Sequence, residues 1–171
     1  VIAIGAFHGY IMLGGKLMNI ELKEKLEKIY DEQVWPHMTL GEFIEDCAKK
    51  YGDKIALVDG DVELSYQELN NWANQIAHYY LSIGANKGDV VALMMENRPE
   101  MLATVLGLAK IGVTIALVNT SQVSKVLAHS INLVKPIAVI SGAECCAAVD
   151  EIRHDLEISE DRFYWFADQE T

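Results

Sequence analysis

Three uncharged polar side chains stand within two residues of the ends of two apolar runs of the sequence, at positions where a ligand could bind. Asn97 follows the run 90–95, and Asn119 and Thr120 follow the run 113–118. If these runs are strands of an open α/β sheet, their carboxyl ends form the edge where ligands gather. We therefore predict that these three residues lie at the edge of a substrate pocket. A purely local alternative is that they cap helices, since Asn and Thr are favoured there.

Histidines and cysteines are the other residue types that could bind a metal or act as nucleophiles. His78 and His129 each lie in a helical pattern without a second ligand four residues further on, so we expect packed or solvent-facing imidazoles. Cys47 stands alone and Cys145 adjoins Cys146, which is not the arrangement that a zinc site requires. We expect all three thiols to be small residues of the core.

An acidic set and an aromatic run near the carboxyl end also suggest chemistry at first sight. The acidic set lacks the D-x-D-x-D-G loop of calcium sites, so a solvated face is expected. The aromatic run 163–166 has the composition of a nucleic-acid stacking platform. However, the chain has a net charge of −11, and nucleic-acid binding relies on Lys and Arg, so we exclude nucleic acid as a partner. The acidic set is Asp150, Glu151, Asp155 and Glu157.

Ser65 ends an alternating stretch, V-E-L-S, directly before a helical pattern. The G-x-S-x-G motif of a nucleophile is absent around it. Glu68 stands three residues later, which gives the S/T-x-x-E spacing of a capping box. Thr39 and Glu42 repeat this spacing ahead of another helical pattern. We expect both hydroxyls to begin helices.

Helices and strands alternate from residue 39 onwards. Asp59-Gly60 predicts the turn of a hairpin, and Pro99 suits the first turn of a helix, with Asn97 or Arg98 near its cap. The alternation predicts an α/β fold, with a mostly parallel sheet and flanking helices. Helices are expected at 39–52, 65–84, 99–112, 121–135 and 143–156, a hairpin at 54–65, and strands at 90–95, 113–118, 137–141 and 162–167.

Residues 1–18 form an apolar segment without charge before Lys16. The segment is too short for a spanning helix and lacks the basic region and cleavage site of a secretory signal. Its glycines do not fit the G-x-G-x-x-G of a dinucleotide site. It either docks on the body or lies on a membrane surface. Residues 21–32 alternate Glu and Lys at helical spacing and predict a solvated helix. Three cysteines make no disulfide framework, so we expect a cytoplasmic protein, with membrane association left open.

Two spaced motifs run through the middle of the chain. The first, L-[TS]-Y-x-E-L, is matched by Leu64, Ser65, Tyr66, Glu68 and Leu69. The second, L-x-x-x-x-x-G-x-x-x-x-x-[LVI]-[ND], is matched by Leu106, Gly112, Val118 and Asn119. In order and spacing they resemble the start of the adenylate-forming superfamily, which includes the acyl-CoA synthetases. M-E-N-R-P-E and L-V-N-T look most like its fatty-acid-transport, very-long-chain acyl-CoA synthetase branch, although Ser121 stands where that branch has Asn. The resemblance covers residues 39–145.

The resemblance implies an enzyme that activates a fatty or other hydrophobic carboxylic acid in two steps. The carboxylate attacks the α-phosphate of ATP to give an acyl-adenylate and pyrophosphate, and the thiolate of coenzyme A then displaces AMP. Mg²⁺ would balance phosphate charge in the first step. The implied partners are thus the acid, ATP, Mg²⁺ and coenzyme A, together with peripheral contact to a membrane.

The parts that this chemistry needs are not in the sequence. The family's phosphate cradle is a Ser/Thr/Gly-rich loop ending in Pro-Lys, because backbone N–H groups must approach the phosphates closely. The nearest stretch, 119–125, has hydroxyls but no glycine. We therefore expect residues 19–171 to be the amino-terminal portion of an incomplete AMP-binding domain, with no catalytic residue, metal ligand or bound cofactor. Its partner would be the remainder of the same enzyme or a second copy of itself.

Two other interpretations stay open. One is a stand-alone binding or scaffold module that holds an apolar ligand or a partner. The other is a nucleotide-binding oxidoreductase domain, because βαβ units serve many functions. A fragment of a larger domain should expose apolar surface and bind a hydrophobic dye, whereas a complete module should not.

Overall fold

The computed structural model describes residues 6–7, 10–13, 16–19 and 38–167, and the chain divides into two compact units, Val1–Met38 and Thr39–Thr171. In the first unit, β1 (Ala6–Phe7), β2 (Tyr10–Leu13) and β3 (Lys16–Asn19) form an antiparallel sheet in the order β1-β2-β3. The solvated helix predicted at 21–32 lies outside the described residues. No helix of the described residues is long and apolar enough to cross a membrane.

Two capping boxes begin the first two described helices, as the spacing predicts. Thr39 caps α2 (Leu40–Tyr51) and Ser65 caps α3 (Tyr66–Ser82), and each hydroxyl accepts a hydrogen bond from the backbone N–H of the glutamate three residues on. In return, the carboxylate of Glu68 accepts hydrogen bonds from the backbone N–H of Ser65, at 2.8 Å, and from its hydroxyl, at 2.7 Å. Ser65 is therefore a structural hydroxyl.

The predicted hairpin is confirmed between these helices. It consists of β4 (Ile55–Asp59) and β5 (Val62–Ser65), which pair with each other as a separate two-stranded sheet. Gly60 has φ +57°, a conformation that glycine adopts at little cost and that the tight turn requires. Two strands alone are marginally stable in water, so the packing of α3 against this hairpin matters.

The main sheet has four strands, all parallel, in the order β7-β6-β8-β9. The fold class predicted from the alternation of elements is therefore confirmed. The central strands are β6 (Val90–Met94) and β8 (Ala138–Gly142), and the outer strands are β7 (Thr114–Leu117) and β9 (Phe163–Phe166).

The helices between these strands differ in part from those predicted. Pro99 begins α4 (Pro99–Lys110) as expected, and Arg98 is its N-cap. The next helix, α5 (Ser124–Leu133), starts later than predicted, because residues 119–122 close a turn instead. The single helix predicted at 143–156 is wrong. A 3₁₀ turn, η1 (Ala143–Cys145), a short α6 (Cys146–Ile152) and a second 3₁₀ turn, η2 (Arg153–Asp155), take its place, and a third, η3 (Glu160–Arg162), precedes β9.

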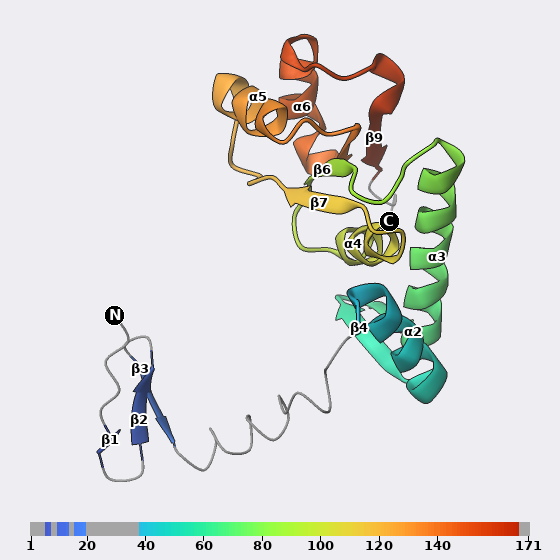
Figure 1. The fold of residues 1–171 in the computed structure, drawn as a ribbon, viewed down its shortest axis with the longest axis vertical. Helices are drawn as coiled ribbons and strands as arrows, with labels where there is room; N and C mark the ends of the chain where they lie inside the picture. The colour runs from blue at the N-terminus through green and yellow to red at the C-terminus, as the bar shows by residue number, and fades with distance from the viewer. Residues whose placement is uncertain (1–5, 8–9, 14–15, 20–37, 168–171) are drawn as a thin grey trace. The chain divides into compact units, whose positions relative to one another are not determined.

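The core has two layers because the side chains of a strand alternate between the two faces of its sheet. Val91, Leu93 and Met95 are buried together with residues of α3 and α4, whereas Ala92 and Met94 are buried with residues of α5 and α6. Figure 1 shows α5 and α6 on one side of the sheet and α4 on the other. The central strand is thus apolar on both faces, as expected for a parallel sheet covered by helices.

Candidate functional site

The carboxyl ends of β6 and β8 meet where the chain changes direction across the sheet. β6 and β8 are neighbours, but β6 leads through α4 to β7, whereas β8 leads through α6 to β9 on the opposite edge. The two connections pack on opposite faces of the sheet, so they diverge. In open α/β sheets such a switch point leaves a crevice, and ligands bind there.

Glu144 ties the two diverging loops together. Its carboxylate accepts a hydrogen bond from the backbone N–H of Glu96, at 2.8 Å, and lies 3.4 Å from Nη1 of Arg98. The Nε of Arg98 donates to Glu100 at 2.8 Å, so one guanidinium serves two carboxylates. Gly142 makes room for this arrangement, since a Cβ there would stand 2.2 Å from the carboxylate oxygens of Glu144. Sequence reasoning missed the network because Glu144 and Arg98 are 46 residues apart.

Asn97, Asn119 and Thr120, the three residues predicted for a pocket edge, lie around one open hollow of about 460 Å³. Met95, Glu96 and Val118 complete its lining. The alternative that these residues cap helices is wrong, because Arg98 is the N-cap of α4 and Val123 that of α5. That they contact a substrate stays a prediction.

The side chains of these three residues differ in how many of their hydrogen-bonding groups are already paired within the chain. The Oδ1 of Asn119 accepts hydrogen bonds from the backbone N–H of Ser121, at 2.9 Å, and from its hydroxyl, at 2.7 Å, so it closes the turn after β7. Within the described residues the side chains of Asn97 and Thr120 have no hydrogen bond. Both side chains, and the Nδ2 of Asn119, can therefore bond a polar ligand.

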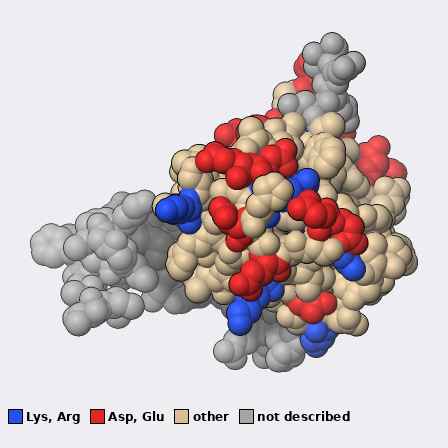
Figure 2. Space-filling view, turned by 90° about the horizontal axis from the view of Figure 1, so that it is seen from above, with Lys and Arg blue, Asp and Glu red and all other residues tan. Residues whose placement is uncertain are grey.

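The hollow does not fit the triphosphate of ATP and its Mg²⁺. Its lining has one carboxylate, two amides and a hydroxyl but no Lys or Arg, and the neighbouring Arg98 is held by two carboxylates. Acidic side chains also predominate over basic ones on the face shown in Figure 2. Anionic phosphates require cations or a cradle of backbone N–H groups, so the described residues alone cannot supply this site.

The cysteines mostly behave as small core residues. Cys47 and Cys145 are buried as predicted, whereas Cys146 is only half-buried. Burial, with a smaller contribution from the nearby carboxylate of Glu144, raises the pKa of the Cys145 thiol to about 11. That thiol is therefore protonated at neutral pH, which makes it a poor nucleophile.

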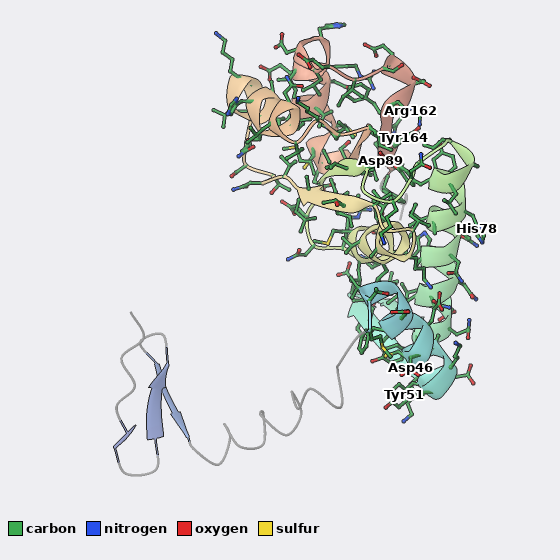
Figure 3. The ribbon with its side chains drawn as sticks, viewed as in Figure 1. Asp46, Tyr51, His78, Asp89, Arg162 and Tyr164 are labelled. Atoms are coloured by element: carbon green, nitrogen blue, oxygen red, sulfur yellow. The ribbon has the colours of Figure 1, made fainter. Side chains whose placement is uncertain are left out.

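The other candidates lie on the solvent side. His78 and His129 are exposed, and Figure 3 shows His78 on the outer side of α3. The acidic set is also exposed: Asp150, Glu151, Asp155 and Glu157. Among residues 38–167, no three His, Cys, Asp or Glu side chains come together as a metal site.

Comparison with known proteins connects this fold with one family. Residues 44–168 match the family model described as AMP-binding enzyme. Over 113 residues, 66% of this chain, the sequence is 34% identical to the medium/long-chain-fatty-acid–CoA ligase FadD6 of Mycobacterium tuberculosis. It is also 34% identical, over 69% of the chain, to long-chain fatty acid transport protein 1 of Rattus norvegicus.

A solved structure gives the same result for the fold. The Mycobacterium tuberculosis fatty acyl CoA synthetase superimposes on 76% of this chain with a TM-score of 0.68 and 26% sequence identity, and the match covers 26% of that protein. The matched part is 19% of each of the two curated relatives. The chain therefore spans about a fifth of the length of the curated relatives it matches.

Proposed function

This chain belongs to the AMP-binding enzyme family, and we propose that it forms the amino-terminal part of an ATP-dependent acid–CoA ligase for fatty or other hydrophobic acids. The family match over residues 44–168 is the observation that carries this proposal. Relatives named as a fatty-acid–CoA ligase and as a fatty acid transport protein support the acid as the substrate class. ATP, Mg²⁺ and coenzyme A would be the co-substrates and cofactor of the whole enzyme.

We assign this chain the role of a scaffold with one wall of the acid pocket. Asn97 and Thr120 would border the pocket at the carboxyl edge of the sheet, and the Glu144–Arg98 network would hold the loop that carries Asn97. Catalysis would depend on residues that this chain does not contain. A cytoplasmic location with peripheral membrane contact is part of the same proposal.

Exposed apolar side chains favour a fragment over a complete binding module. Trp165 on β9, Leu117 on β7 and Leu133 on α5 are each more than 60% exposed, which a buried interface with further polypeptide would explain. A hydrophobic dye should therefore bind the purified chain and gain fluorescence. A monodisperse chain that leaves the dye dark would favour the stand-alone module.

Two measurements test the ligase assignment. The purified chain, incubated with ATP, Mg²⁺ and a fatty acid, should exchange no pyrophosphate above a heat-killed control. The coding frame downstream of Thr171 should encode a Ser/Thr/Gly-rich loop and a later lysine, and the longer product should catalyse exchange that depends on the fatty acid. Exchange by the short chain would refute its scaffold role. A stop codon directly after Thr171, or exchange driven only by small hydrophilic acids, would refute the ligase proposal.

A further inference from the structure

A second and larger cavity lies between the β4–β5 hairpin, α3 and the loop from β6 to α4. Its volume is about 570 Å³, within the range of roughly 300–1,000 Å³ typical of small-molecule sites. Val62, Leu64, Trp72 and Pro99 give it an apolar wall.

Charge selects the class of ligand. Four carboxylates, those of Asp59, Glu96, Glu100 and Glu144, line this pocket together with one guanidinium, that of Arg98, so the lining has a formal charge of −3. Arg98 is only 19% exposed and lies 2.8 Å from Glu100 and 3.4 Å from Glu144. Its positive charge is thus already matched, and an entering carboxylate or phosphate would meet net repulsion.

Two of these carboxylates are available to pair with a cation. Asp59 comes from the hairpin and Glu96 from the loop after β6, on two different elements that line the pocket. Neither has an ion-pair partner within the described part of the chain. The indole of Trp72 adds an aromatic surface, which attracts alkylammonium groups when they lie over the ring face.

We propose that this pocket binds a small organic cation, a primary alkylammonium with an aliphatic body. The ammonium group pairs with Asp59 and Glu96, and the aliphatic part covers the apolar wall at Val62, Leu64 and Trp72. This pocket adjoins the hollow at Asn119 and Thr120, because Glu96 and Asn97 line both, but Asp59 and the apolar wall belong to this pocket and not to the hollow. The proposed binding of a cation does not depend on the proposed ligase activity. It adds a binding function of opposite charge preference to that of an acid-activating site.

Three probes of equal chain length test the charge preference: hexylammonium, hexanol and hexanoate. Each is titrated into the purified chain at low salt and neutral pH, with binding followed by NMR at the tryptophan indole N–H signals, and the Trp72 signal is assigned through Trp72→Phe. We expect saturable binding of hexylammonium, about ten-fold weaker binding of hexanol and none of hexanoate. Binding of hexylammonium should weaken at high salt, because the pair is partly exposed.

Variants of single carboxylates, with one control, test which of them pair with the ammonium group. Asp59→Asn and Glu96→Gln should each weaken hexylammonium binding about three-fold or more. Glu63→Gln is the control, because Glu63 lies between two pocket-lining residues of β5, so its side chain points to the opposite face. Equal binding of hexanol and hexylammonium would overturn the proposal, as would binding of hexanoate, an equal effect of Glu63→Gln, or no shift of the Trp72 signal. The three-probe comparison in the unaltered chain stands even if a variant does not fold.

Discussion

Single residues with local partners stabilise the starts of α2 and α3. In each capping box a hydroxyl, a carboxylate and two backbone N–H groups satisfy one another within four residues. Ser65 is buried to 8% exposure, so its polar groups would lose water without gaining a partner if Glu68 were absent. These contacts were predictable from sequence because both members of each pair lie in one short motif.

Replacing Ser65 by Ala should destabilise the chain. Ser65→Ala leaves the backbone N–H of Glu68 without its acceptor, and we expect a loss of about 1 kcal/mol in the free energy of unfolding. Urea unfolding followed by circular dichroism measures it. Ser82→Ala, at the other end of α3, removes an exposed hydroxyl that bonds Tyr79 O and should cost about 0.5 kcal/mol or less. Equal costs for the two variants would contradict the capping role.

The same residues predict a dependence of stability on pH. Hydrogen bonds from the backbone N–H and then the hydroxyl of Ser65 hold the pKa of Glu68 below its ordinary value of 4.5. The stabilisation by the ionised carboxylate is therefore complete above pH 4.5 and is lost as the pH falls through the lower pKa of the folded state. We expect the difference in unfolding free energy between the chain and Glu68→Gln to shrink from about pH 6 to about pH 3.

The same comparison in a Ser65→Ala background provides the control for this pH effect. In Ser65→Ala the carboxylate of Glu68 loses the hydroxyl that it accepts from, so the pH-dependent difference should be smaller there. Urea midpoints of the four variants at each pH give the comparison. A difference that stays constant with pH, or that is unchanged in the Ser65→Ala background, would show that the capping carboxylate does not contribute in this way.

Elements pack through contacts that local sequence patterns do not encode. The positions of β6, β7, β8 and β9 were predictable, since apolar runs and intervening helical patterns are local features. The division of 143–156 into a short helix between two 3₁₀ turns was not predictable, because Glu144 bonds the backbone of Glu96 in the loop after the neighbouring strand. Likewise the hollow at Asn97 and Asn119 followed from the rule for sheet edges, but the Glu144–Arg98 contact required the strand order.

Gly107 sets the distance between α3 and α4. A Cβ at this position would stand 2.7 Å from the carbonyl oxygen of Ala73 and 2.9 Å from Cβ of Ile76. Gly107→Ala should therefore push the helices apart and lower the free energy of unfolding by about 1–3 kcal/mol. Urea unfolding of Gly107→Ala and of the unaltered chain measures the loss, and a neutral Gly107→Ala would show that the two helices can separate without cost.

The whole chain consists of a small antiparallel unit and an α/β unit. The strands of the first unit pair only with one another among the described residues. Within residues 38–167, both clusters of buried side chains lie between Ile44 and Phe163. The strands of the α/β unit thus find their sheet partners within that unit. Composition predicts a division at residue 18, where the apolar segment ends, whereas the first compact unit ends at Met38.

A chain of residues 39–171 should therefore fold alone. We expect its urea midpoint to lie close to that of the complete chain, with the unfolding free energies equal within about 1 kcal/mol. Circular dichroism and size-exclusion chromatography provide the measurement, and the Ser65→Ala variant in both lengths shows whether the same cooperative unit is being observed. Loss of the folded signal on truncation would show that the first unit stabilises the second.

The strand order also bears on chain entropy. β6 meets β7 at a sequence separation of 24 residues (Val90 with Thr114) and meets β8 at 47 (Val91 with Ala138). Because the entropy of loop closure grows only with the logarithm of length, this near doubling costs about 0.6 kcal/mol. The turn that carries Asn119 and Thr120 lies inside the longer loop. Insertions there would add little to the cost of closing the sheet, so this turn can change length, and with it the shape of the hollow, while the four strands keep their register.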